Sequence, residues 1–366
     1  MSSRFPTRVR LLVRAAAHRL GDRGNRVRRP LPERVLVVAT LLAGDALFLA
    51  PLLAKLRQRY PAAKIGVAVS RAAAPLFSGR PYGAEAFVHD PRDAGTIAAL
   101  AAWGRPDLAL VVGDNRFSLS AAAVGARWIV AFSGDRPGYK SWYVDEFRPM
   151  SAVPMAWGDM AATLADGEAP PPYAAGDWPA PAYLPFDAPA GRYAVLHVEA
   201  STPLKHWQEE KWFSLAEFLM KKEIHPIWSA GPAGGALLQR IDPAARFPAL
   251  GHRLDLAQLW HLIAGAALLL CPDTSVMHIG RLAGTPTVAL FGPSSASLFG
   301  PGEFWRRVPY RAVTVENFFC RDQHRLFKRE IAWIQRCQRT PAECPAPLCM
   351  HAIDVEAVVQ AALELL

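Results

Sequence analysis

The segment from Ala267 to Ser295, ALLLCPDTSVMHIGRLAGTPTVALFGPSS, constrains the fold of this 366-residue chain more than any other stretch. Its first apolar run predicts a buried strand that ends before Asp273. Thr274 or Ser275 is placed to cap a helix that Gly284 closes, and a second apolar strand follows. This strand–helix–strand order is typical of a parallel α/β sheet, whose helix starts bind phosphate beyond the strand ends.

The turn inside this segment is a candidate ligand site. Thr274 and His278 are four residues apart, so both side chains fall on one face of the predicted helix. The free backbone N–H groups at the helix start favour an anion. Spacing alone leaves a second interpretation equally open, namely an ordinary β-α-β unit with a satisfied cap and a surface histidine.

The same alternation of strands and helices recurs twice along the chain, on either side of a proline-rich stretch. Nine prolines between 149 and 189 mark a linker. We therefore predict an α/β protein with two Rossmann-like domains, whose parallel sheets face a central cleft. The predicted parts are a basic arm (1–33), an acceptor-side domain (34–150), a linker (151–190), a donor-binding domain (191–350) and a C-terminal helix (351–366) that packs back on the first domain.

The net charge of +9 comes almost entirely from the N-terminal arm. Residues 1–34 hold ten arginines against two acids, which gives +8 there and leaves +1 for the rest. A nucleic-acid-binding body is therefore not predicted. The arm alternates arginine with Val, Leu and Ala at helical spacing, which suits an anionic inner-membrane surface. A disordered tail and an extension without a role remain open as alternatives.

No transmembrane or secretory segment is predicted. The most apolar window, 35–54, would place Asp45 in the middle of a membrane at a cost of about 2.5–3.5 kcal/mol. A buried strand, a turn at Gly44-Asp45 and a helix explain this window better. The arm also lacks a long apolar core and a small-residue cleavage site. We expect a cytoplasmic protein, peripheral on the inner membrane where the arm binds it.

Two further loops follow predicted strands and carry reactive groups. Asp45 starts a helix, where an acid is electrostatically favoured, but it is also a candidate base for a substrate hydroxyl. Ser201 and Thr202 precede Lys205, which is either a solvated lysine or a partner for a phosphate. Together with the 273–278 turn, these loops suggest group transfer from a nucleotide-activated donor.

Three separated pieces make the chain resemble glycosyltransferase family 9, the heptosyltransferases of lipopolysaccharide assembly. The pieces are the strand and Gly44-Asp45 turn followed by LRQRYPAAKI, the segment LKHWQEEKWFSLAEFL, and CPDTSVMHIGRLAGTPTVALFGPSS. The tail, CPAPLCMHAIDVEAVVQAAL, is similar to the family's Cys-Met-x-x-Ile ending. The likeness covers about residues 34–366, and each motif lies in the strand–turn–helix context it requires.

The resemblance implies a GT-B fold and inverting transfer by single displacement, without a metal at the reaction centre. It implies that Asp45 is the general base and that Lys205, beside Ser201 and Thr202, meets the donor phosphates. The donor turn would comprise Asp273, Thr274, Ser275 and His278. A lysine and a helix start can stabilise a departing nucleoside diphosphate without metal.

The sequence departs from the family pattern at two places. Ser275 stands where the family has glycine, so a side chain either narrows the pocket or adds a hydroxyl contact. Family members often have an acid in the loop that corresponds to residues 230–236, where it can hold the nucleoside ribose. This sequence has no acid there. On the acceptor side, Gly44, Asn115 and Arg116 are candidates, with an exposed loop as the alternative for the last two.

Four of the five cysteines cluster near the C-terminus, at positions 320, 337, 344 and 349. Four thiolates suit a structural zinc or iron ion, but the common Cys-x-x-Cys knuckle is missing. We therefore weigh a structural metal held by Cys320, Cys337, Cys344 and Cys349 against free or regulatory thiols. No cofactor is expected for the chemistry itself.

The resemblance implies an inverting transferase that moves a heptose from a nucleotide-sugar donor. The expected donor is ADP-heptose. The acceptor implied by the resemblance is a lipid-linked oligosaccharide, a core sugar of lipopolysaccharide. Two alternatives stay open. One is a protein O-heptosyltransferase of the same family, and the other is a scaffold that binds sugar nucleotides without turnover.

Overall fold

The computed structural model describes residues 4–22, 26–39, 43–250 and 253–366 and divides them into two compact units. Unit 1 comprises Met1–Pro171 together with Arg325–Ala332, and unit 2 comprises Pro172–His324 and Trp333–Leu366. The division at 171–172 falls within the proline-rich stretch. A short segment late in the chain thus belongs to the first unit, although the sequence suggests that it continues the second.

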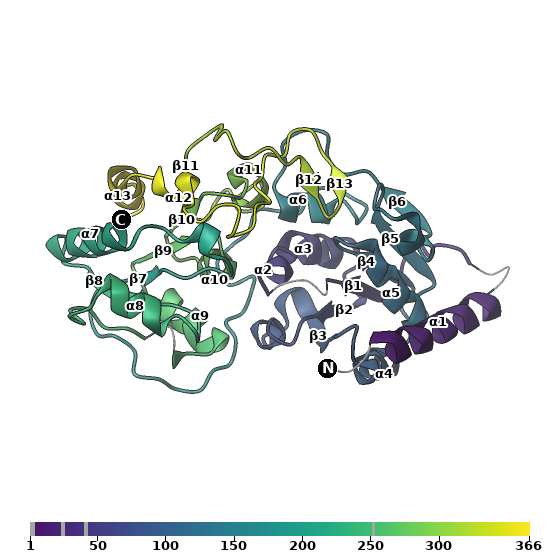
Figure 1. Cartoon of the computed structure of the whole chain (residues 1–366). Coiled ribbons are helices and arrows are strands. Elements are labelled where there is room, and N and C mark those ends of the chain that lie inside the picture. Colours follow the sequence, from purple (N-terminus) through teal and green to yellow (C-terminus); the bar gives the residue numbers. More distant parts are fainter. Residues whose placement is uncertain (1–3, 23–25, 40–42, 251–252) are drawn as a thin grey trace. The chain divides into compact units, whose positions relative to one another are not determined.

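Unit 1 contains a six-stranded parallel sheet in the order β3-β2-β1-β4-β5-β6 (Figure 1). Its strands are β1 (Arg34–Val38), β2 (Lys64–Val69), β3 (Ala84–Val88), β4 (Leu108–Val111), β5 (Trp128–Phe132) and β6 (Glu146–Arg148). Its helices are α1 (Arg4–Gly21), α2 (Ala43–Leu47), α3 (Ala50–Arg59), α4 (Ala94–Trp103), α5 (Ser118–Val124) and α6 (Trp157–Ala162). The central strands β1, β2, β4 and β5 are mostly apolar and buried, because helices cover both sides of such a sheet.

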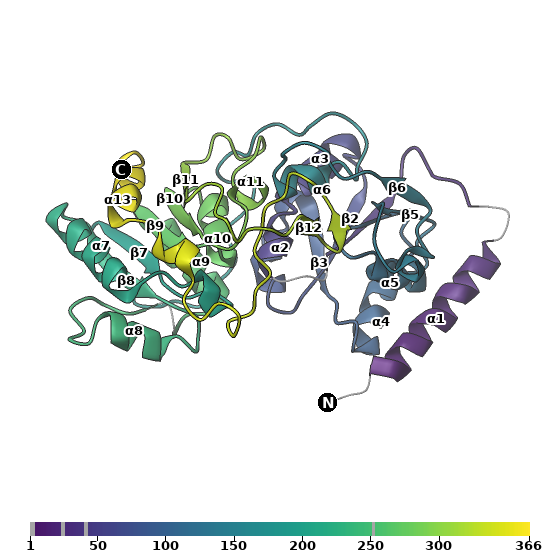
Figure 2. The same ribbon diagram turned by 45° about the horizontal axis from the view of Figure 1, so that its top comes forward.

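One predicted helix of unit 1 is two helices. The sequence predicts a continuous helix from Ala46 to Tyr60, but α2 ends at Leu47 and α3 begins at Ala50. Pro51 lies in the first turn of α3 and has no N–H to continue a helix from the preceding turn. The described N-terminal arm is also helical: α1 buries Leu11 and Ala15 and lies along α5, beside α4 (Figure 2).

Unit 2 contains a five-stranded parallel sheet in the order β11-β10-β9-β7-β8. The strands are β7 (Tyr193–His197), β8 (His225–Ser229), β9 (Leu268–Pro272), β10 (Thr287–Phe291) and β11 (Tyr310–Thr314). The helices are α7 (Glu209–Lys221), α8 (Gly235–Ile241), α9 (Leu256–Ala264), α10 (Ser275–Ala283), α11 (Ala296–Phe299), α12 (Leu348–His351) and α13 (Val355–Leu363). The segment from Ala267 to Ser295 forms β9, α10 and β10 of this sheet.

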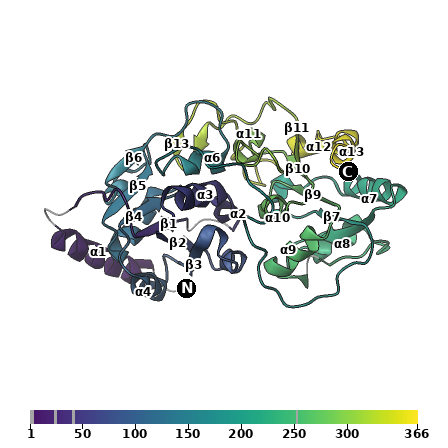
Figure 3. The ribbon, with the colours of Figure 1, turned by 180° about the vertical axis from the view of Figure 1, so that it is seen from behind.

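The C-terminal helix α13 packs within unit 2. Its buried residues Val358 and Ala362 join the same core as Leu219 of α7, and α13 also lies against β11 (Figure 3). The Trp207 indole N–H donates to the Ile353 carbonyl at 2.9 Å, which ties the α12–α13 turn to the loop before α7. This helix therefore belongs to the core of unit 2, and its expected packing on the first domain stays a prediction.

The segment that unit 1 takes from late in the chain is a small antiparallel hairpin of β12 (Arg325–Leu326) and β13 (Arg329–Glu330). Phe327 lies against Trp157 of α6 with ring centroids 4.9 Å apart. Arg329 is buried and donates to the carbonyls of Gly113 (2.8 Å) and Ser133 (2.7 Å), beyond the ends of β4 and β5. This arginine therefore satisfies backbone groups that sheet hydrogen bonds leave over.

Candidate functional site

Unit 2 brings together a lysine and a carboxylate from two neighbouring strand ends. Lys205 follows β7 and Asp273 follows β9, which pairs with β7. Lys205 Nζ donates to Asp273 Oδ2 at 2.7 Å and to the Asp273 carbonyl at 2.9 Å. The carboxyl ends of parallel strands meet at one edge of a sheet, where ligands of such folds bind. Two of the predicted site residues are thus in direct contact.

The Asp273 carboxylate is fixed from a third strand end as well. The Ser294 hydroxyl, beyond β10, donates to the same Oδ2 atom, and the Asp273 N–H donates to the Leu290 carbonyl at 2.9 Å. Asp273 is buried, whereas Lys205 is half-buried. We call Lys205, Asp273 and Ser294 the open cluster. A pair held this rigidly presents the lysine in one place at the sheet edge.

Helix α10 begins beside the open cluster. Thr274 is its N-cap, with the Thr274 hydroxyl accepting from the Val276 N–H at 3.2 Å, and Gly284 ends it at φ +75°. Both predictions from the sequence are confirmed. Arg281 anchors the helix from within: its guanidinium is fully buried, donates to Phe299 O at 2.8 Å and lies 4.2 Å from the Tyr310 ring centroid. The helix start is therefore held at the strand ends.

An open pocket of about 260 Å³ adjoins the start of α10. Its lining comes from the ends of β7 and β8 and from the helix start, namely His197, Glu199, Ala200, Ser201, Gly231, Pro232, Ala233, Thr274 and Ser275. The pocket thus combines backbone N–H donors, hydroxyls and one carboxylate. Such a set suits a ligand with an anionic part and a neutral part rich in hydroxyls.

Glu199 is the functional candidate that the sequence reasoning missed. The 230–236 loop has no acid of its own, but Glu199 reaches it from the neighbouring strand, and its Oε2 accepts the Gly231 N–H at 2.7 Å. A Cβ added at Gly234 would lie 2.6 Å from this oxygen, so glycine there leaves room for the carboxylate. The available signal in the sequence was an acid two residues after the strand that ends at His197.

The two histidines at this edge are neutral. Burial lowers the pKa of His197 to about 4, and its Nδ1 lies 2.9 Å from Ser229 Oγ. Burial, together with the charges of Arg281 and Lys205, lowers the pKa of His278 well below its usual value. His278 is buried and is not part of the pocket lining, whereas Thr274 lines the pocket. The two side chains therefore do not face the same pocket, although their spacing predicts a common helix face.

The other predicted donor residues lie around the pocket in different ways. Ser201 and Ser275 line it, the former exposed and the latter half-buried. Thr202 instead caps the short helix that carries Lys205, and its hydroxyl accepts from the Leu204 N–H at 3.4 Å. The donor roles assigned to these residues stay predictions. Their positions agree with a ligand that binds in the pocket beside Ser275.

In unit 1, the predicted base Asp45 lies in α2 next to Gly44, and both are half-buried. The preceding part of this predicted loop, residues 41–42, lies outside the described residues. An acid in the first turn of a helix is favoured by the helix dipole. Asp45 takes part in an interaction within the structure, and its role as a base stays a prediction.

Asn115 is not placed to contact an acceptor. Its side chain is fully buried, donates to the Phe132 carbonyl and to Ser141 Oγ at 2.9 Å each, and accepts from Arg329 at 2.8 Å. Lys140 Nζ bridges Asp114 and Asp135 at 3.0 Å each in the same interior. We call Asp114, Asn115, Asp135, Lys140 and Arg329 the closed cluster. Arg116 stays exposed and pairs with Asp114 at 3.0 Å. Of the two predicted residues Asn115 and Arg116, only Arg116 therefore has an accessible head group.

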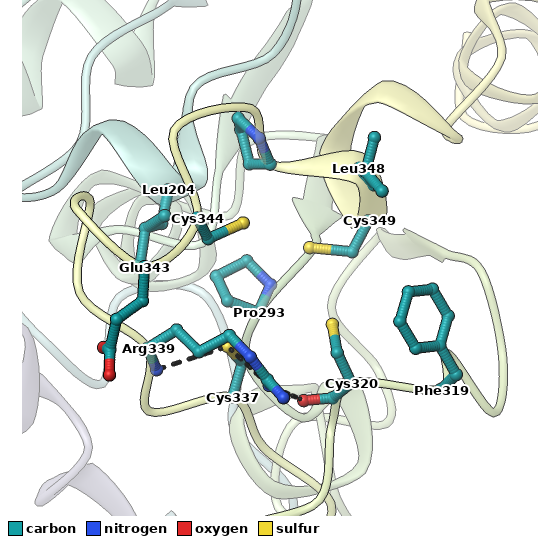
Figure 4. Close-up of a pocket in the computed structure, with 11 residues that line it drawn as sticks. Leu204, Pro293, Phe319, Cys320, Cys337, Arg339, Glu343, Cys344, Leu348 and Cys349 are labelled. Carbon is teal, nitrogen blue, oxygen red and sulfur yellow. Dashed lines mark hydrogen bonds between the residues drawn. The ribbon is translucent and has the colours of Figure 1, made fainter.

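The four C-terminal cysteines line one pocket of about 120 Å³ in unit 2 (Figure 4). Burial raises the pKa of Cys349 to about 11, and the charges of Cys320 and Cys337 act in the same direction. The cysteines are free, and among the described residues no three such side chains are gathered closely enough to hold a metal ion. The donor set is suitable in kind for a soft metal, and a structural metal at these cysteines stays a prediction.

Comparisons with known proteins agree with this architecture. Residues 155–312 match the family model of Glycosyltransferase family 9 (heptosyltransferase). Lipopolysaccharide heptosyltransferase 1 of Pseudomonas aeruginosa is 28% identical over 161 residues, which are 41% of this chain and 44% of that protein. In this segment the chain is similar to glycosyltransferase family 9. It aligns with less than half the length of this curated relative.

Solved structures share the fold of most of this chain. Escherichia coli heptosyltransferase WaaC with ADP has a TM-score of 0.68 at 17% identity, covering 91% of this chain and all of that one. The iron-containing dodecameric glycosyltransferase TibC of enterotoxigenic E. coli has a TM-score of 0.56 at 14% identity, covering 93% and 77%. The predicted GT-B class, with two parallel-sheet units, is confirmed.

Proposed function

We propose that the chain is an inverting glycosyltransferase that moves a heptose from a nucleotide-activated donor to a core sugar of lipopolysaccharide. The observation that carries this proposal is the open cluster beside the start of α10 and the pocket that Glu199 and Ser275 line. It joins a positioned lysine, free helix-start N–H groups and a carboxylate, which together match a nucleoside diphosphate. The name of the P. aeruginosa relative supports the choice of sugar and acceptor.

In the proposed reaction, the acceptor oxygen forms a bond to the anomeric carbon while the bond from that carbon to the phosphate oxygen breaks. Asp45 takes the proton of the acceptor hydroxyl, and the bonding electrons leave with the nucleoside diphosphate. The departing group gains negative charge, which Lys205 and the α10 start stabilise. One displacement with no enzyme nucleophile inverts the configuration at the anomeric carbon.

ADP-heptose is the proposed donor because the fold matches a heptosyltransferase described with ADP. A thermal-shift panel of ADP-, UDP- and GDP-sugars tests this choice directly. We expect the ADP compounds to raise the melting temperature most, because only the favoured base fills the pocket beside Glu199. An equal shift by all three would overturn the choice of base without touching the diphosphate site.

Replacing Asp45 with Ala tests the catalytic proposal. We expect transfer to a lipopolysaccharide acceptor to fall at least about 10³-fold, because general-base catalysis contributes up to about 10⁴-fold. Donor affinity, measured by calorimetry, should change less than about twofold. Retained turnover would contradict the base assignment. Donor binding by the wild type, with no turnover on any acceptor, would favour the non-catalytic scaffold.

A protein O-heptosyltransferase is the second candidate, and the cysteine pocket is the observation that favours it. TibC, which shares the fold, is described as iron-containing. Metal analysis of the purified full chain separates the candidates. We expect below one tenth of an equivalent of zinc or iron and five thiols that react with a disulfide reagent after unfolding, because all five cysteines are free. One equivalent of either metal would favour the second candidate.

A further inference from the structure

Helix α1 packs on unit 1 through a narrow stripe only. Thr7, Leu11 and Ala15 are buried, at spacings of four residues, and the Thr7 hydroxyl donates to the Arg92 carbonyl at 3.1 Å. The Arg14 Nε donates to the Ala123 carbonyl of α5 at 3.3 Å. The helix is thus docked along one line of its surface, and its remaining circumference faces solvent (Figure 2).

The solvent side of α1 is apolar at its centre. Val9, Leu12, Val13 and Leu20 are all exposed, and Val13 has 64% of its surface accessible. In helical projection these residues lie roughly opposite the buried stripe. The usual amphipathic helix of a water-soluble domain has the reverse arrangement, with its polar face outward. An outward apolar face of this kind indicates a binding surface.

Arginines flank this outward face. Arg8, Arg10 and Arg14 are exposed, and the sequence of α1 contains five arginines and no acid. Arg19 near the end of α1 and Arg26 and Arg28 beyond the helix differ, because they pair with Asp145 or Glu146. The basic charge of the arm therefore divides into a part that unit 1 neutralises and a part that α1 presents.

Two exposed aromatic residues extend the surface. Trp142 has 77% of its surface accessible, and its ring lies 6.2 Å from that of Tyr139. The segment that carries them runs beside α1, because the Arg8 guanidinium lies 5.9 Å from the Tyr139 ring and that of Arg19 lies 5.7 Å from the Tyr143 ring. Tryptophan and tyrosine favour the boundary between hydrocarbon and lipid headgroups.

We propose that the outward face of α1, together with Tyr139 and Trp142, docks unit 1 onto an anionic phospholipid bilayer. The valines and leucines enter the acyl boundary, and the arginines contact lipid phosphates at its rim. A nucleic acid fits this surface poorly, because its phosphates would meet an apolar centre. The proposal goes beyond the transfer reaction and needs neither donor nor acceptor. Among the described residues no helix is long and apolar enough to span a membrane, so docking here is peripheral.

Co-sedimentation of the full chain with vesicles tests this surface. The probes are vesicles of phosphatidylcholine alone and vesicles with 30% phosphatidylglycerol. We expect binding to the anionic vesicles to be at least tenfold tighter, because each arginine near the surface adds about fivefold. Val13→Asp should weaken that binding at least tenfold, because it places a charge in the acyl boundary. Arg10→Ser should weaken it about fivefold.

Val153→Asp is the matched control, since Val153 is an equally exposed valine of unit 1 (63%) away from α1. It should bind like the wild type. Circular dichroism melts of both aspartate variants check that the fold is intact. Equal binding by Val13→Asp and Val153→Asp overturns the proposal, as does wild-type binding that short duplex DNA displaces. Size-exclusion chromatography provides one more test. If the wild type elutes as a dimer and Val13→Asp elutes as a monomer that still binds vesicles, the outward face of α1 contacts a second copy of the chain, and the proposal is overturned.

Discussion

The open cluster of unit 2 and the closed cluster of unit 1 both pair a lysine with a carboxylate, but they differ in solvent access. Each places a lysine against carboxylates beyond the ends of parallel strands. The Lys205 side chain is 23% exposed beside a pocket, whereas that of Lys140 is 6% exposed, with Arg329 sealing the same interior. The location at a strand end therefore does not make a site; solvent access decides whether a ligand can replace one of the partners.

Lys140→Met should break the closed cluster with the largest effect. It leaves the buried carboxylates of Asp114 and Asp135 without their shared cation, which typically costs about 3–5 kcal/mol of unfolding free energy. Urea unfolding measures this. Arg116→Ala is the matched control because Arg116 pairs with the same Asp114 from an exposed position, and it should cost under about 1 kcal/mol. Similar losses in both variants would mean that burial is not what distinguishes the cluster.

Lys205→Ala should have the opposite profile. We expect turnover to fall about 10²–10³-fold, because a charge at the departing diphosphate is lost. The free energy of unfolding should fall by under about 1 kcal/mol, since the pair is partly exposed. Lys222→Ala, an exposed lysine after α7, is the control for general charge effects. A large loss of unfolding free energy with normal turnover would mean that Lys205, like Lys140, stabilises the fold and does not act in the reaction.

Acid should destabilise the protein through its buried neutral histidines. Burial lowers the pKa of His89, in unit 1, from 6.5 to about 4. Below pH 6.5 the unfolded chain takes up the proton first, so stability is full above that pH and is lost as pH falls toward 4. The loss amounts to up to about 3 kcal/mol.

Denaturant unfolding at pH 7.0, 5.5 and 4.5 follows the effect of His89. His89→Gln should be less stable at pH 7, because the His89 ring nitrogens lie near Thr96 Oγ1 and Ser120 Oγ, but its stability should depend less on pH. The exposed His225 provides the control, and His225→Gln should keep the wild-type slope. An unchanged slope in His89→Gln would refute this account.

Glu199→Gln should have the smallest effect and sharpen the account of the open pocket. A carboxylate accepts hydrogen bonds from sugar hydroxyls more strongly than an amide does, so we expect ADP affinity to fall about tenfold. Calorimetry with 2′-deoxy- and 3′-deoxy-ADP should show little further loss in the variant. Glu217→Gln, on the exposed side of α7, serves as the control. If the variant discriminates against deoxy-ADP as the wild type does, Glu199 does not contact the ribose.

The ends of the strands could be predicted from the sequence better than the side chains that contact one another beyond those ends. The sequence predicts strands at 193–197 and 225–229 and a helix at 209–221. β7, β8 and α7 have these bounds, because period and caps are local properties. The position of Asn115 could not be predicted, since its burial depends on Arg329, which lies 214 residues further along. Glu199 was missed for a similar reason: its carboxylate serves a loop of the next strand, and only the sheet order brings the two together.

The hairpin that carries Arg329 has a consequence for how the chain is made. Unit 1 is nearly complete at Pro171, but its interior lacks the guanidinium until residues 325–332 have left the ribosome. Until then Asp135 and the carbonyl of Gly113 lack a partner that the finished protein supplies. Residues 172–324 of unit 2 must therefore be synthesised before unit 1 can be finished, and a separately expressed half that ends at Pro171 would lack the hairpin.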